Sequence, residues 1–181
     1  MRFALVLAIA SVAFAASAAP VREREFPDWK QCDPKWANVS LGNCSRSDTI
    51  CVDGSTETCL AMLVASRGYK GNPGTFVDWL TNNGAYNDVD GWCVLDYTKI
   101  DPLGYSKYFD ILENHGETTY RKVCALMEKG VGVLAWNGHN YLVTNCSEAG
   151  LKVNDPKCSP ESEKCEDFMG ITSAYQYTLF L

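Results

Sequence analysis

The chain contains very little histidine and no closely spaced pair of cysteines. Only 2 of its 181 residues are histidine, and no C-x-x-C motif occurs, although 9 cysteines are present. Structural zinc sites take their ligands from such cysteine pairs and from histidine. The cysteines are therefore not predicted to bind zinc, and we expect neither a metal nor another cofactor.

The sequence also lacks clusters of lysine and arginine. It has 16 basic and 22 acidic side chains, which gives a formal net charge of −6. A surface of this sign repels phosphate groups, so we expect neither a nucleic acid nor an anionic membrane as a partner. No internal repeat, low-complexity tract or proline-rich linker divides the chain.

Only the first residues form a long apolar run. Arg2 precedes apolar residues 3–14 and small residues up to Ala19, with Pro20 next. This pattern is typical of a secretory signal peptide, and the run is shorter than the roughly 20 residues that span a bilayer. We expect residues 1–19 to be such a signal and residues 20–181 to form a single secreted domain without a membrane span. The sequence leaves the oligomeric state open.

All the cysteines follow this segment, and export would favour disulfide formation. The simplest prediction is four disulfides and one free thiol. Cys158 with Cys165 and Cys44 with Cys51 would each close a local loop, while Cys59 is our preferred buried free thiol, with Cys124 as the other candidate. Glycosylation sequons, which fit passage through a secretory pathway, begin at Asn38, Asn43 and Asn145.

Apolar spacing predicts helices in the first half and strands in the second. Helices are expected over residues 55–67, 73–82 and 118–128. Strands are expected over 131–136, 140–145, 151–154 and 175–181, with a further short strand over 92–96. The first two of these strands flank Asn137-Gly138-His139 and predict a hairpin. The fold class is α+β, with N-terminal helices packed on a C-terminal antiparallel sheet and stabilised by disulfides.

This architecture would bring four polar residues together: Gln31, Ser55, His139 and Asp155. Ser55 opens the first long helix, where unpaired backbone N–H groups and the helix dipole stabilise a developing oxyanion. His139 begins an apolar strand and can act as a base, while Asp155 follows the next strand and can orient the imidazole. Gln31 can add a side-chain amide donor. The arrangement is that of a nucleophilic acyl-transfer site.

Each residue also has a simpler interpretation. Ser55 can be an ordinary helix N-cap, His139 can end a turn, and Asp155 can belong to a structural Asn-Asp-Pro turn. Gln31 can bond to backbone. Cys59, one turn after Ser55 on the same helix face, could supply a thiol, although packing in the core or a disulfide is the commoner role for such a residue.

These residues and their neighbours resemble a papain-like cysteine peptidase of the C39-like kind. The resemblance covers nearly all of residues 20–181 and rests on QCDPKW (31–36), LG (41–42), TICVDG (49–54), AM (61–62), residues 73–80, GHNYLV (138–143) and NDP (154–156). It implies the papain-like fold, a Cys-His-Asp triad and a glutamine oxyanion donor. Gln31, His139 and Asp155 match that set, but Ser55 stands where the family has a cysteine after glycine.

The serine changes the chemistry that the resemblance implies. A cysteine can be kept as a thiolate because its pKa of about 8.5 can be lowered by several units, whereas a serine hydroxyl must lose its proton during the attack. Thr56 and Glu57 also replace the residues usual after the nucleophile. Glu57 adds negative charge near a developing oxyanion, although it also suits a helix N-terminus.

Three functional hypotheses follow. The first is an inactive peptidase homologue that retains a cleft for peptides or glycans. The second is a secreted hydrolase that uses Ser55, His139 and Asp155, with Gln31 and the Ser55 N–H as oxyanion donors. The third is a disulfide-rich structural or defence protein without a cleft. The distances among Ser55, His139 and Asp155 discriminate between the third hypothesis and the first two.

Overall fold

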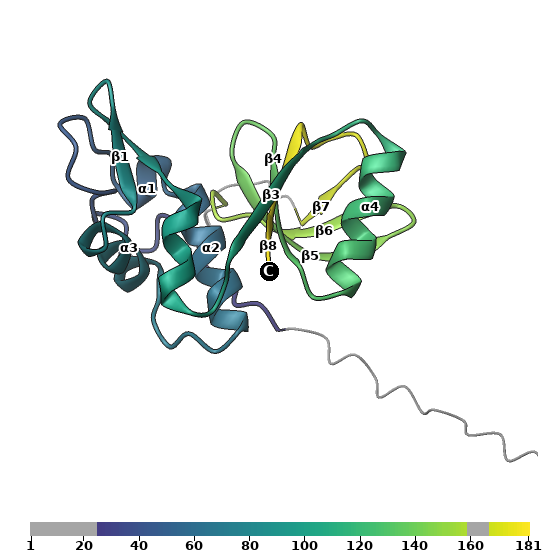
Figure 1. Cartoon of the computed structure of the whole chain (residues 1–181), viewed down its shortest axis with the longest axis horizontal. Coiled ribbons are helices and arrows are strands. Elements are labelled where there is room, and N and C mark those ends of the chain that lie inside the picture. The colour runs from purple at the N-terminus through teal and green to yellow at the C-terminus, as the bar shows by residue number, and fades with distance from the viewer. Residues whose placement is uncertain (1–24, 159–166) are drawn as a thin grey trace, which may run out of the picture.

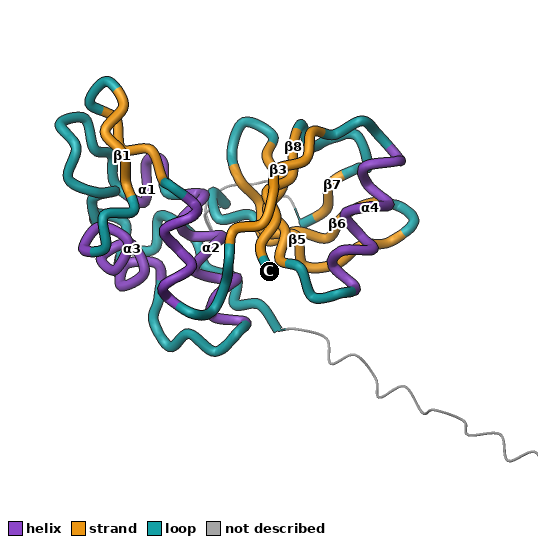
Figure 2. The backbone as a smooth tube through the Cα atoms, in the orientation of Figure 1, coloured by secondary structure: helices purple, strands orange, loops and turns teal. Residues whose placement is uncertain are grey.

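The computed structural model describes residues 25–158 and 167–181. The signal peptide expected over residues 1–19 and the expected partner of Cys158, Cys165, lie outside the described residues. Three helices and a small hairpin form one side of the molecule, and a larger sheet with one further helix forms the other (Figure 1). Figure 2 shows this separation of helices and strands along the backbone.

The helical side comes from the first half of the chain. It contains three α-helices, a two-stranded sheet and a 3₁₀ helix, namely α1 (Ile50–Asp53), α2 (Ser55–Ser66), α3 (Pro73–Asn82), β1 (Tyr86–Val89), β2 (Trp92–Leu95) and η1 (Tyr97–Leu103). The sheet side contains the remaining elements, namely β3 (Tyr108–Glu113), α4 (Glu117–Glu128), β4 (Gly132–Trp136), β5 (Asn140–Ser147), β6 (Gly150–Asn154), β7 (Phe168–Met169) and β8 (Gln176–Phe180).

The larger sheet has six strands in the order β3-β8-β4-β5-β6-β7, and every neighbouring pair is antiparallel. The hairpin of β4 and β5 pairs Leu134 with Leu142 and Val133 with Val143. Because side chains alternate across a sheet, the two leucines enter the core shared with α2, while the two valines enter the core beneath α4.

Helix α2 is the central element of the fold. Its residues 59–64 are all fully buried, as expected of a helix that is apolar on every side. One side contacts β5 and β4, and another contacts α3. Gly54 joins α1 to α2, and a Cβ atom at this position would lie only 2.5 Å from the carbonyl oxygen of Ile50. The absence of a side chain at Gly54 thus permits the tight junction that places Asp53 and Ser55 close together.

Several elements agree with the sequence prediction. The three predicted helices, the hairpin of β4 and β5, and strands β2, β6 and β8 form within a few residues of the expected bounds. The chain is therefore mixed α+β with antiparallel sheets. The prediction missed α1, β1, η1, β3 and β7, and the first half is less purely helical than expected. Within the described residues, no helix combines the length and apolar character needed to cross a membrane.

Three disulfides lie within the described residues, and they correct part of the predicted pairing. Cys44 bonds to Cys93 and not to Cys51, and Cys51 bonds to Cys32 instead. A third bridge joins α4 to β5 through Cys124 and Cys146, so Cys124 is not a free thiol. Cys59 is buried and free, as the sequence analysis preferred.

Candidate functional site

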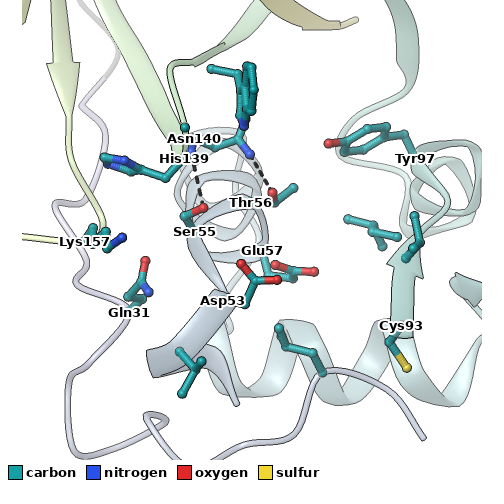
Figure 3. A pocket seen from close by; sticks show the side chains of 16 residues that line it. Gln31, Asp53, Ser55, Thr56, Glu57, Cys93, Tyr97, His139, Asn140 and Lys157 are labelled. Carbon is teal, nitrogen blue, oxygen red and sulfur yellow. Dashed lines mark hydrogen bonds between the residues drawn. The ribbon is translucent and has the colours of Figure 1, made fainter. Parts of the chain in front are cut away.

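A cavity of about 350 Å³ lies at the N-terminal end of α2, where this helix meets the start of β5. Its lining comes from the loop before α1, from the α1–α2 junction, from β2 and η1, and from the turn between β4 and β5 (Figure 3). Three of the four predicted site residues, Gln31, Ser55 and His139, line this one cavity. Asp155 is hydrogen-bonded to His139, so the fold gathers all four around one place.

Ser55 is the first residue of α2 and is 7% exposed. The N-cap of this helix is Gly54, and no side chain caps it, so the interpretation of Ser55 as an ordinary N-cap is wrong. Its hydroxyl oxygen instead accepts a hydrogen bond from the backbone N–H of Asn140 at 3.2 Å. A second bond, from the Asn140 side-chain amide to Thr56 Oγ1 at 2.7 Å, reinforces this junction between α2 and β5 (Figure 3).

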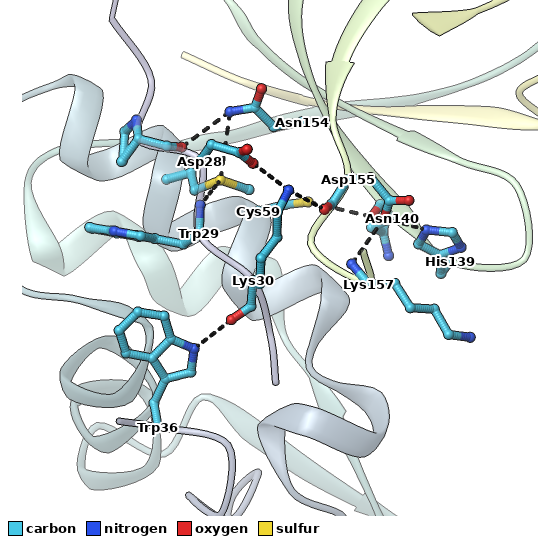
Figure 4. A network of polar contacts seen from close by, with 12 residues as sticks. Asp28, Trp29, Lys30, Trp36, Cys59, His139, Asn140, Asn154, Asp155 and Lys157 are labelled. Atoms are coloured by element: carbon cyan, nitrogen blue, oxygen red, sulfur yellow. Dashed lines mark hydrogen bonds and ion pairs between the residues drawn. The ribbon is translucent and has the colours of Figure 1, made fainter. Parts of the chain in front are cut away.

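His139 follows the turn between β4 and β5, and its Nε2 lies 2.9 Å from Oδ1 of Asp155. Asp155 is buried and is itself held by surrounding groups (Figure 4). Oδ1 also accepts from the backbone N–H of Lys157 at 2.9 Å, and the Asp155 carbonyl accepts from Lys30 Nζ at 3.0 Å. In the neutral imidazole, an Nε2–H donated to Asp155 leaves Nδ1 as the basic nitrogen. The pair therefore has the arrangement of an oriented base.

The link between this base and the hydroxyl is missing. Among the described residues, which include both side chains, no hydrogen bond joins Ser55 Oγ to the His139 ring. A general base must lie about 2.6–3.2 Å from the proton that it removes. Ser55 and His139 face one cavity, but the hydroxyl is positioned by the Asn140 N–H and not by the imidazole.

Gln31 is 2% exposed, and its orientation differs from the role that the sequence predicts for it. Its side-chain nitrogen donates to the carbonyl oxygen of Cys51 at 2.7 Å, and its backbone N–H donates to the Pro156 carbonyl at 2.8 Å. The amide oxygen is buried and has no hydrogen-bond partner among the described residues. Figure 3 shows this oxygen on the side of Gln31 that faces Ser55. Gln31 thus offers the cavity an acceptor, where an oxyanion hole requires a donor.

Two carboxylates, Asp53 and Glu57, also line the cavity. Glu57 is 4% exposed, and its Oε1 accepts a hydrogen bond from Tyr86 Oη at 3.3 Å. Burial raises the pKa of Glu57 to about 7, and the nearby Asp53 carboxylate adds to this effect. Asp53 is exposed, but partial desolvation and the nearby Asp48 carboxylate raise the pKa of its carboxyl group. Glu57 was expected near the site from the sequence and Asp53 was not, although residues four positions apart lie on one face of a helical segment.

Cys59 is not placed to act as a nucleophile in this cavity. It lies in the middle of the core, and its Sγ is 3.5 Å from the carbonyl oxygen of Asn140. Burial raises the pKa of the Cys59 thiol well above its ordinary value, which opposes the formation of a thiolate nucleophile. Nor do the described residues contain a group of three or more His, Cys, Asp or Glu side chains that could hold a metal ion.

Comparisons with protein-family models, with curated proteins and with solved structures find no match for this chain. The chemistry of the cavity therefore has to be inferred from its own residues. The groups that meet there are an oriented His139–Asp155 pair, a hydroxyl that is not bonded to it, two carboxylates and an unpaired amide oxygen.

Proposed function

We propose that this chain is a secreted, C39-like homologue of papain-like peptidases whose cleft binds peptides without cleaving them. The observation that carries the proposal is the position of the Ser55 hydroxyl, which accepts from the Asn140 N–H and is not bonded to His139. A serine is a poor nucleophile unless an adjacent base removes its proton during the attack. On this proposal, the His139–Asp155 pair is inherited from a peptidase and now serves only as part of the wall of the cleft.

The charges of the cavity also oppose acyl transfer. The tetrahedral intermediate places negative charge on the former carbonyl oxygen and needs hydrogen-bond donors to stabilise it. In this cavity the unpaired group of Gln31 is an oxygen, and Asp53 and Glu57 add two acidic side chains. Each of these groups repels an oxyanion. The same groups are compatible with binding a ligand that carries donors.

The rim of the cavity suits a peptide better than a carbohydrate. Val52, Val94 and Trp136 line it and are 63%, 48% and 37% exposed. Exposed apolar side chains around a polar floor are common in sites that bind other polypeptides. Asp53 and Lys157 are also exposed there, but Trp136 is the one exposed aromatic residue of the lining, which leaves few ring faces on which a sugar could stack. We therefore favour an extended or looped peptide as the ligand class.

An active serine hydrolase is the second candidate, and the hydrogen bond between His139 and Asp155 is what favours it. Small movements of Ser55 in a substrate complex would be needed to complete its triad, since catalytic hydrogen bonds often tighten only in such complexes. The absence, among the described residues, of a bond between Ser55 and His139 favours the third hypothesis, a structural protein without a cleft, but the cavity that Gln31, Ser55 and His139 line together opposes it.

A fluorophosphonate probe tests the proposal against the hydrolase. We expect the wild-type protein to be labelled no more strongly than Ser55→Ala, which measures background reaction. Labelling of the wild type that disappears in both Ser55→Ala and His139→Ala would overturn the proposal in favour of a working triad.

The variant Ser55→Cys tests the inherited site itself. A thiol at the start of α2, beside His139, is expected to react with iodoacetamide faster than a free model thiol, because the helix N-terminus favours the thiolate. The double variant Ser55→Cys with His139→Ala should react more slowly. A thiol at position 55 that reacts no faster than the model compound would remove the support for a peptidase ancestry.

A further inference from the structure

We propose that the cavity selects a basic side chain of the bound peptide, arginine in particular, whose guanidinium is received by Asp53, Glu57 and the amide oxygen of Gln31. This inference rests on the proposed function, since it names the substrate class of the same cleft. It follows from three observations on the described residues: two acidic groups, one buried acceptor without a partner, and exposed apolar side chains at the rim.

The two carboxylates lie together on one wall of the cavity. Asp53 ends α1 and Glu57 lies in the first turn of α2, with Gly54 between the two helices. Figure 3 shows the carboxyl groups side by side. No ion pair engages either of them within the part of the chain that the structure describes. Lys157, the one basic Lys or Arg side chain among the lining residues, lies nearer to His139, although its charge still lowers the pKa of Asp53.

The amide oxygen of Gln31 is an independent sign of a ligand with donors. A buried acceptor that forms no hydrogen bond destabilises the folded state, and such groups are rare in folded proteins. The amide cannot be turned to remove this cost, because the donor at 2.7 Å from the Cys51 carbonyl would then be replaced by a second oxygen. A ligand N–H in the cavity would satisfy the Gln31 oxygen.

Arginine fits these groups better than other side chains do. Its planar guanidinium carries five N–H donors in a fixed fork and stays charged when it is partly buried. Its aliphatic stem can lie along apolar surface while its charged end reaches polar groups, and Val52 and Val94 provide that surface at the entrance. Lysine supplies a positive charge with fewer and less directional donors, so we expect it to bind more weakly.

Binding should also depend on pH. Burial keeps the pKa of Glu57 near 7 in the free protein, with Asp53 raising it and the Tyr86 hydroxyl lowering it. The other titratable groups around Glu57 are Tyr97 on η1 and Cys59 on α2, and burial raises the pKa of both. A guanidinium prefers the charged Glu57, so affinity for arginine should rise as the pH increases through about 7.

The test uses the full chain after its signal peptide and three blocked tripeptides, Ac-Ala-Arg-Ala-NH2, Ac-Ala-norleucine-Ala-NH2 and Ac-Ala-Glu-Ala-NH2. Dissociation constants are measured by NMR titration well above and well below pH 7. We expect the arginine peptide to bind at least about tenfold more tightly than the norleucine peptide at the higher pH. At the lower pH this preference should fall to about threefold or less.

Three variants locate the effect. Glu57→Gln and Asp53→Asn should each reduce the arginine preference at least about fivefold while leaving the binding of the norleucine peptide unchanged. The matched control is Glu113→Gln, because its exposed side chain on β3 loses the same charge without lining the cavity. It should retain the full preference, which separates local recognition from the effect of net charge.

The possible failures have different meanings. Equal binding of the arginine and norleucine peptides would overturn the selection of a basic side chain and leave the peptide-binding cleft standing. If the glutamate peptide binds more tightly than the other two peptides, Lys157 and not the acidic groups governs recognition, and the selection of a basic side chain is wrong. If Glu113→Gln loses as much preference as Glu57→Gln, the attraction is a property of the whole surface and the inference is wrong. Failure of every peptide to bind would overturn the inference and the binding cleft together.

Discussion

The burial of Glu57 predicts an unusual dependence of stability on pH, which Glu57→Gln should remove. Glu57 is 4% exposed, and its carboxyl group accepts one hydrogen bond from the Tyr86 hydroxyl. Its pKa is raised from 4.5 to about 7, mainly by burial. Since the folded state holds this proton more tightly than the unfolded state, the group stabilises the folded state fully at pH values below 4.5. That contribution is lost as the pH rises to about 7.

The size of the effect follows from the two pKa values. A difference between 4.5 and about 7 corresponds to about 3 kcal/mol of unfolding free energy. Glutamine has nearly the same shape, never ionises, and can still accept from the Tyr86 hydroxyl through its carbonyl oxygen. Glu57→Gln should therefore leave stability almost unchanged near pH 4 and increase it, relative to the wild type, by about 3 kcal/mol near pH 8.5.

Urea unfolding of both proteins at the two pH values, with the disulfides intact, measures this quantity. Titrating groups that do not interact with Glu57 cancel in the difference between wild type and variant, and the neighbouring Asp53 carboxylate contributes only to the size of the Glu57 shift. Glu113→Gln serves as the control here too, and as a substitution of an exposed group it should change stability by less than about 0.5 kcal/mol at each pH. The stability of Glu57→Gln relative to the wild type should rise between the two pH values. If it rises by less than about 1 kcal/mol, burial does not desolvate the Glu57 carboxylate.

Two further variants test the links within the helical side and between that side and the sheet. Replacing both Cys44 and Cys93 by serine opens a loop with a sequence separation of 49 residues, and chain-entropy reasoning predicts a loss of about 4 kcal/mol. A loss under about 1 kcal/mol in urea unfolding would contradict it. Arg67→Lys should cost about 2 kcal/mol, because the guanidinium donates to carbonyls of Phe180 and Leu181 as well as to loop acceptors. Arg121→Lys on exposed α4 is the control, and an equal loss there would refute the special role of Arg67.

The elements that could be predicted from the sequence are those whose signals are local. Helix α3 begins at Pro73 after Asn72, and a capping box forms between Asn72 and Thr75. The hairpin of β4 and β5 has apolar strands on both sides of a turn that contains Gly138. Each of these signals lies within a few residues of the structure that it determines, so no knowledge of the rest of the chain is needed.

The elements that were missed depend on distant partners. Strand β3 lies at the edge of the sheet, and Phe109 and Ile111 on it are 48% and 39% exposed. Its residues therefore do not show the alternation of buried and exposed positions that predicts a strand. The segment forms a strand because it pairs with β8. Strand β1 is similar, since it is exposed along most of its length and pairs with β2. The Cys44–Cys93 bridge was missed for the same reason, because a local loop was the only pairing that spacing could suggest.

The candidate site shows the same limit in its chemistry. Ser55, His139 and Asp155 each lie at the end of a recognisable helix or strand, so the sequence predicts that they gather, whereas Gln31 lies in a loop before the first helix. The sequence does not predict the direction of their hydrogen bonds. The N–H of Asn140 positions Ser55, and the carbonyl of Cys51 turns Gln31 so that its oxygen is left unpaired. Both partners are backbone groups, which every sequence contains, so side-chain identity cannot reveal them. A site that suits acyl transfer by its residue types thus becomes, by the direction of its hydrogen bonds, a site rich in acceptors.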